Sequence, residues 1–180
     1  AELIAHLDNS DLWSQASHST VYIYQMASGL EHEKATKLWS LIFGISVGIL
    51  IDVRTGLVAG ASFAVGGLWL SPDLDTNSKP LKRWGFLKIL WIPYRKLIPH
   101  RSLLSHGFLI GTSLRVIYLL VTIGISILIL DSLGMPLQSN YYQILFEITR
   151  KYPKEIIAIL SALEVSAWLH LYQDHNLKKN

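Results

Sequence analysis

The chain has 180 residues, of which 51% are hydrophobic and only 16% are charged, with a formal net charge of +3 at pH 7. Disordered chains combine low hydrophobicity with high net charge, so this composition excludes disorder. The charged fraction lies below the roughly 25% usual for soluble domains, which favours a membrane protein. The absence of cysteine excludes disulfides, thiolate metal sites and cysteine nucleophiles.

The first 27 residues differ from the rest of the chain. They contain no Lys or Arg and no long apolar run, so they lack the two features of a secretory signal. We interpret residues 1–27 as a flexible N-terminal extension and residues 28–177 as a single helical membrane metal-binding domain. Ser28 and Glu31 have the spacing of a capping box, which predicts that the first helix begins at Ser28.

Four apolar segments follow, at residues 38–51, 56–70, 103–130 and 155–172. The uncharged cores of the first two are only about 15 residues long, fewer than the ~20 that cross a bilayer comfortably. The third is the strongest candidate, because Arg115 is its only charged residue. The sequence therefore predicts an all-α, four-helix membrane bundle. A soluble all-helical protein with an unusually apolar core is the alternative.

The connections between these segments are a short polar turn at 52–55, a basic loop at 72–101 and a polar stretch at 131–154. Three pairs of glycines lie four residues apart, which predicts close approach of helix backbones inside lipid; they are Gly44 and Gly48, Gly56 and Gly60, and Gly107 and Gly111.

The distribution of basic residues predicts the orientation. If all four segments span, eleven of the sixteen Lys and Arg residues fall on the face that holds the 72–101 loop and the C-terminus, and four on the other. Cytoplasmic loops carry such an excess, so this face is expected to be cytoplasmic. We expect an integral protein of a bacterial inner or thylakoid-type membrane, with membrane lipids as its partners.

Seven residues with metal-ligating side chains fall at or near that same face: His32, Asp73, Asp75, His100, His106, His170 and Asp174. His170 and Asp174 are one helical turn apart, so their side chains project from one side. Taken singly, each of the seven is explained equally well as a capping residue, a solvated turn or a hydrogen-bonded pair. Their shared face favours a metal site, which would hold one or two ions of Zn, Mn or Fe(II).

These residues also carry a resemblance. The strings Ser-Gly-Leu-Glu-His at 28–32, Leu-Ser-Pro-Asp-Leu-Asp at 70–75 and His-Arg-Ser-Leu-Leu-Ser-His-Gly at 100–107 resemble a family of uncharacterised metal-binding proteins found largely in photosynthetic bacteria. That family is similar in pattern to the YdjM-like membrane-bound proteins, which are predicted metal-dependent hydrolases. The resemblance implies metal binding at the same seven residues, and hydrolysis as the associated activity.

Two further residues are candidates for catalysis. Arg101 could steady an anion, and Glu164 lies near the middle of an apolar helix, where a carboxylate is costly and is by default functional. Glu164 is expected to act as a general base or to pair with Arg115. The predicted function is hydrolysis of a lipid-like ester or phosphoester at the cytoplasmic membrane face, with no nucleic-acid partner. A non-catalytic metal sensor, store or assembly factor is the alternative; the oligomeric state is not predicted.

The basic asymmetry yields a test of topology. Reporter fusions placed within residues 72–101 and at the C-terminus should both report the cytoplasm, because basic loops are retained on that side. Opposite locations for the two reporters would show that the number of spans is not four.

Overall fold

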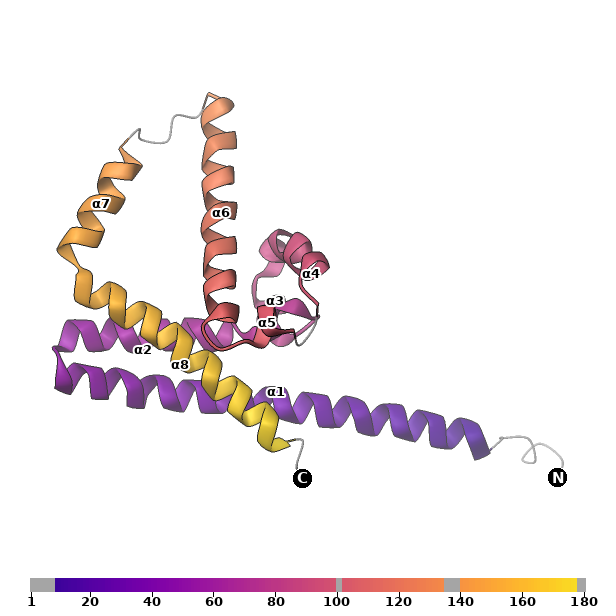
Figure 1. The fold of residues 1–180 in the computed structure, drawn as a ribbon. Coiled ribbons are helices and arrows are strands. Elements are labelled where there is room, and N and C mark those ends of the chain that lie inside the picture. Colours follow the sequence, from indigo (N-terminus) through magenta and orange to yellow (C-terminus); the bar gives the residue numbers. More distant parts are fainter. Residues whose placement is uncertain (1–8, 100–101, 135–139, 178–180) are drawn as a thin grey trace, which may run out of the picture.

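The computed structural model describes residues 9–99, 102–134 and 140–177, and within these ranges it contains helices and no strand. The all-α class predicted from the sequence is therefore confirmed. Five longer helices and five short helical segments occur in the order shown in Figure 1: α1 (Asn9–Leu50), α2 (Val53–Leu68), η1 (Pro72–Asp75), α3 (Lys79–Arg83), η2 (Gly85–Trp91), α4 (Ile92–Leu97), α5 (Leu103–His106), α6 (Ile110–Ser132), α7 (Tyr141–Lys151) and α8 (Pro153–Leu177).

Helices α1 and α2 form a tight antiparallel hairpin (Figure 1). Asp52 caps α2 by accepting hydrogen bonds from the backbone N–H and the hydroxyl of Thr55, at 2.8 and 2.9 Å. A Cβ atom added at Gly56 would lie 2.5 Å from the Cα of Gly48 and 2.6 Å from the carbonyl oxygen of Gly44. The two backbones are thus in contact through glycine, as predicted for this pair of helices.

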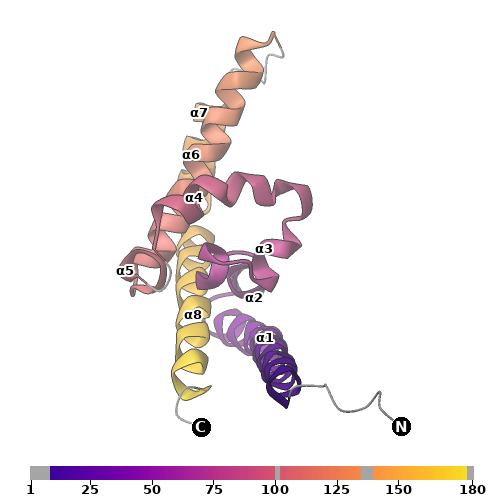
Figure 2. The same ribbon diagram turned by 90° about the vertical axis from the view of Figure 1, so that its right-hand side faces the viewer.

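Helix α8 lies across the hairpin and completes a three-helix core (Figures 1 and 2). The interface includes the small residues Gly66 of α2 and Ser166 of α8, since a Cβ added at Gly66 would lie 3.1 Å from the Ser166 side chain. Small residues allow the helix axes to approach closely. This packing brings the C-terminal half of α8 beside the middle of α1.

The first helix begins at Asn9 and not at Ser28, so the predicted boundary was wrong. Residues 9–28 contain neither glycine nor proline, and nothing in them ends a helix. Ser28 and Glu31 therefore lie inside one continuous helix and do not form its cap.

Two segments expected to be connections contain helices. Residues 72–99 fold into four short helical segments around a small core of their own, made by Leu74, Leu81, Trp91, Tyr94 and Ile98. The polar stretch 131–154 contains α7, whose apolar residues Ile144, Leu145 and Ile148 recur at helical spacing. Frequent prolines in the first segment and frequent charges in the second concealed these short periodic patterns.

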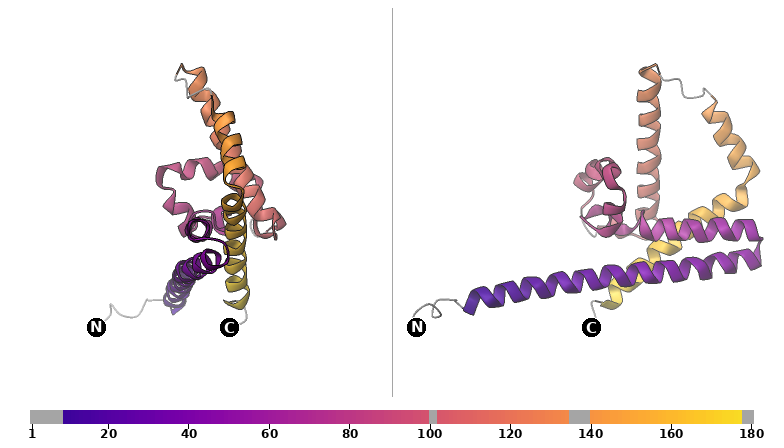
Figure 3. Two further views of the ribbon diagram at one scale, coloured as in Figure 1. Left: turned by 90° about the vertical axis from the view of Figure 1, so that its left-hand side faces the viewer. Right: turned by 180° about the vertical axis from the view of Figure 1, so that it is seen from behind.

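Three segments within the described residues are long and apolar enough to cross a membrane: Val53–Asp75, Ile110–Ser132 and Pro153–His175. This supports membrane association. The second of these, α6, rises away from the hairpin and contacts the rest of the protein through its first turns (Figures 1 and 3). The arrangement therefore differs from the predicted four-helix bundle, because α6 offers an apolar surface along most of its length and few polar groups that would fix it to the other helices.

The glycine contact in the hairpin can be tested by substitution. Gly56→Ala should lower the free energy of unfolding by about 1–3 kcal/mol, because the added methyl group meets backbone atoms that cannot move aside. Thermal unfolding in detergent measures the change. Gly124→Ala in α6 is the matched control, since a Cβ at Gly124 has no neighbour within 4 Å. Equal stabilities of the two variants would contradict the close contact.

Candidate metal centre

Five of the predicted ligands converge where α1, η1, α5 and α8 meet. They come from segments far apart in the sequence: His32, Asp73, His106, His170 and Asp174. Local structure places three of these residues. His170 and Asp174 are one turn apart near the end of α8, and Asp73 lies in the turn η1, whose Ser71 side chain accepts the N–H of Asp73 at 3.4 Å. The turn is fastened further by Ser78, whose hydroxyl donates to the Asp73 carbonyl at 2.7 Å.

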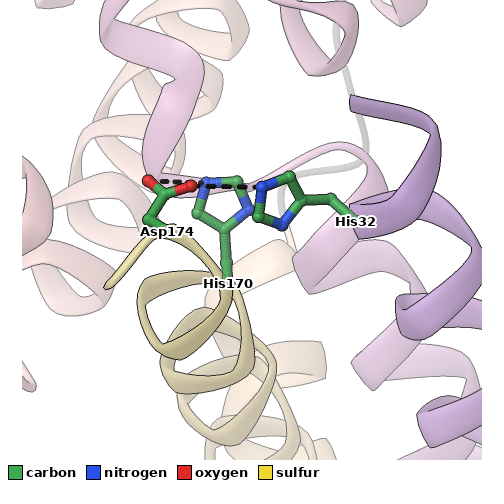
Figure 4. A group of neighbouring side chains, drawn as sticks. All are labelled: His32, His170 and Asp174. Carbon is green, nitrogen blue, oxygen red and sulfur yellow. Dashed lines mark ion pairs between the residues drawn. The ribbon is translucent and has the colours of Figure 1, made fainter. Parts of the chain in front are cut away.

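The first group of candidate ligands is His32, His170 and Asp174 (Figure 4). The Asp174 carboxylate reaches both rings from one side, with Oδ1 3.1 Å from Nε2 of His32 and Oδ2 3.8 Å from Nε2 of His170. The ring centroids of His32 and His170 are 4.4 Å apart. Ligand atoms around a tetrahedral zinc ion, with bonds of about 2.0–2.2 Å, lie about 3.3–3.6 Å apart, so these separations fit a shared ion.

The second group is Asp73, His106 and Asp174. Asp73 lies between two histidines, with Oδ2 3.2 Å from Nε2 of His170 and Oδ1 4.0 Å from Nε2 of His106. In each group the ligand atoms lie within 4.8 Å of one another. Asp174 belongs to both groups, so the two sets of ligands are contiguous.

The donor set fits a transition metal. Imidazole nitrogens and carboxylate oxygens are the ligands that Zn, Mn and Fe(II) share. The buried Nε2 of His170 faces two carboxylates, with Asp73 Oδ2 at 3.2 Å and Asp174 Oδ2 at 3.8 Å. A bound cation would interact with this nitrogen and with both carboxylates.

The two histidines outside the candidate spans differ in basicity. Burial lowers the pKa of His32, but the Asp174 carboxylate and the Gln173 side chain raise it by more, so the net pKa is above the ordinary value. Burial holds the pKa of His106 below its ordinary value despite the nearby Asp75 and Asp73 carboxylates. A histidine binds metal in its neutral form, so the lowered pKa of His106 favours metal binding, whereas the raised pKa of His32 opposes it.

Neighbouring polar groups orient the ligands. Gln173 Oε1 lies 2.6 Å from Nδ1 of His32, and Ser105 Oγ lies 2.8 Å from Nδ1 of His106, which leaves the Nε2 atoms facing the carboxylates. Such partners fix the ring and its tautomer in metal sites. The sequence reasoning missed both, because glutamine and serine next to a ligand are too common to form a signal.

The other predicted residues lie elsewhere. Asp75 is buried with Oδ2 3.7 Å from Nδ1 of His106, on the side of the ring that faces away from Asp73, and belongs to neither group. Glu164 Oε1 accepts hydrogen bonds from the backbone of Leu109 and the indole of Trp168, and it too is outside both groups. His100 and Arg101 lie outside the described residues.

Comparisons with known proteins give the family to which the chain belongs. No solved structure matches the chain. A curated relative, an uncharacterized protein of Aquifex aeolicus (strain VF5), is 43% identical over 61 residues. The alignment covers 33% of this chain and 43% of the relative, so the chain matches less than half of that protein. The sequence model of a family described as "Uncharacterized metal-binding protein (DUF2227)" matches residues 27–179. This chain belongs to the DUF2227 family of uncharacterized metal-binding proteins, and the resemblance to such a family is confirmed.

Proposed function

We propose that this protein holds two transition-metal ions in adjacent sites that share Asp174. The observation that carries the proposal is the membership of Asp174 in both ligand groups. One group adds His32 and His170, and the other adds Asp73 and His106. A carboxylate with two oxygens can bridge neighbouring ions, as it does in two-metal hydrolytic centres.

The chemistry of the ligands supports zinc, manganese or iron(II). The sites offer imidazole together with carboxylate, which suits these ions better than Ca²⁺ or Mg²⁺, whose ligands are oxygen atoms alone. Zinc is our first choice, because three nitrogen and oxygen ligands with one open position are typical of its catalytic sites.

We further propose that the centre hydrolyses an ester or phosphoester of a lipid-like molecule. Its ligands lie near the ends of two candidate spans, Val53–Asp75 and Pro153–His175, and the end of a span lies at the level of the lipid headgroups. Bound ions would supply Lewis-acid activation of water and of the ester. The part of the site open to solvent is its carboxylate side, since the Asp73 and Asp174 side chains are 31% and 25% exposed but that of His170 only 7%.

In this proposal the chain itself positions the reactants. Asp73 and Asp174 lie at the entrance, where an incoming substrate would meet them, and the less exposed histidines form the floor. Arg101 is proposed to neutralise the anion, and general-base catalysis by Glu164 remains a prediction. A non-catalytic metal store, sensor or assembly factor is the alternative, and it would have both ions closed off by protein ligands, whereas a catalytic ion retains an open position.

The shared ligand gives the sharpest test. Purified protein in detergent, titrated with Zn²⁺, should bind two equivalents. Asp174→Ala should weaken both by at least the ~10–100-fold typical of losing a supporting residue. His32→Ala and His106→Ala should each remove one equivalent, while His170→Ala should remove the equivalent that His32 also binds. Asp75→Ala should weaken the equivalent that depends on His106.

His175→Ala is the matched control, because His175 is exposed, follows Asp174 directly and belongs to neither group. Complete loss of metal in both His32→Ala and His106→Ala would indicate one ion and contradict the two-site arrangement. Two equivalents in every variant would show that the metal binds elsewhere.

A further inference from the structure

The corner between α5 and α6, residues 105–111, carries the ligand His106 and is held by two buried charged side chains of opposite sign. Arg115 of α6 is 1% exposed and Glu164 of α8 is 8% exposed. Neither belongs to the ligand groups. Isolated buried charges are costly, so each needs a specific partner.

Arg115 is bonded to the residue immediately before His106. Its Nη1 donates a 2.7 Å hydrogen bond to the carbonyl oxygen of Ser105, and its Nη2 donates a 3.1 Å bond to the hydroxyl of Thr112. Because the peptide between Ser105 and His106 is rigid, the guanidinium fixes the place at which the His106 backbone begins. The same Ser105 orients the His106 ring through its own hydroxyl.

Glu164 is bonded to the other end of the corner. Its Oε1 accepts the N–H of Leu109 at 2.8 Å and the indole N–H of Trp168 at 2.5 Å. Leu109 has φ of 59°, and among the described residues it is the one non-glycine with positive φ. Such a conformation is unfavourable for leucine and persists only where the surroundings enforce it. Trp168 stacks on Phe108 with ring centroids 4.4 Å apart, which adds a second contact between α8 and the corner.

The two side chains therefore hold the corner from opposite ends, one from α6 and one from α8. Within the described residues no ion pair of 4.0 Å or less joins Arg115 to Glu164, and each side chain is instead hydrogen-bonded to the corner. We propose that Arg115 and Glu164 are positioning residues that clamp the α5–α6 corner and keep His106 within reach of Asp73. This inference rests on the proposed metal centre.

The first experiment compares shape-preserving and disruptive variants at the clamp by zinc titration of detergent-purified protein. Glu164→Leu and Arg115→Met should weaken the equivalent bound by Asp73, His106 and Asp174 at least tenfold and leave the other equivalent unchanged. Glu164→Gln should retain both, because its amide oxygen still accepts the hydrogen bonds of Leu109 and Trp168. Arg54→Met and Glu155→Leu are the matched controls, since this ion pair (3.3 Å) joins α2 to α8 away from the corner.

The second experiment moves the corner without altering a charge. It tests whether the position of the corner controls zinc binding at His106, even if the clamp variants do not fold. A Cβ at Gly111 would lie 2.6 Å from the Ser105 carbonyl oxygen and 3.4 Å from the His106 nitrogen. Gly111→Ala should therefore shift His106 and weaken the same single equivalent at least tenfold. Gly124→Ala in the same helix should bind zinc as the unmodified protein does.

The outcomes separate the two proposals. Unmodified protein that binds no zinc would refute the proposed function. Two equivalents in the unmodified protein, both bound with unchanged affinity in Gly111→Ala or in folded Glu164→Leu and Arg115→Met, would overturn the clamp alone. Loss of zinc in Glu164→Gln equal to that in Glu164→Leu would also overturn it, because Glu164 would then be acting through its charge and not through the hydrogen bonds of the corner.

Discussion

The space beside Gly67 is where α1, α2 and α8 meet, and the geometry of the metal centre depends on it. A Cβ at Gly67 would lie 2.5 Å from the Thr36 methyl carbon and 2.9 Å from the Ser166 hydroxyl oxygen, both on buried residues. Without that atom, α1 and α8 close onto α2. His32 lies one turn before Thr36, and His170 one turn after Ser166. The same contact therefore sets the two imidazole rings 4.4 Å apart.

Around these rings, imidazoles and carboxylates alternate. The order in space is His32, Asp174, His170, Asp73, His106 and Asp75, with each neighbouring pair 3.1–4.0 Å apart. Carboxylates that are partly buried need nearby positive charge or hydrogen-bond donors to reduce the cost of burying them. Metal ions held between the imidazoles and the carboxylates would supply this positive charge.

The α5–α6 corner connects this centre to the rest of the chain in a second way. Helix α6 contacts the three-helix core through its first turns, which contain Arg115 and follow directly after His106. The residues that fix α6 to the core are therefore the residues that place His106. A shift of α6 relative to α8 would first change the hydrogen bond between the Leu109 N–H and the Glu164 carboxylate.

The sequence by itself determined the helical class, the apolar segments and the residue types of the centre, because these follow from local composition and from spacings of one helical turn. His170 and Asp174 could be paired in this way, and the ends of the predicted helices placed His32, Asp73 and His106 near them. Which carboxylate lies between which histidines, the departure of α6 from the bundle and the attachment of Glu164 to Leu109 were decided by tertiary structure alone. These depend on contacts between helices 55 to 141 residues apart in the chain, such as Leu109 with Glu164 and His32 with Gln173, and no local pattern encodes the relative placement of such segments.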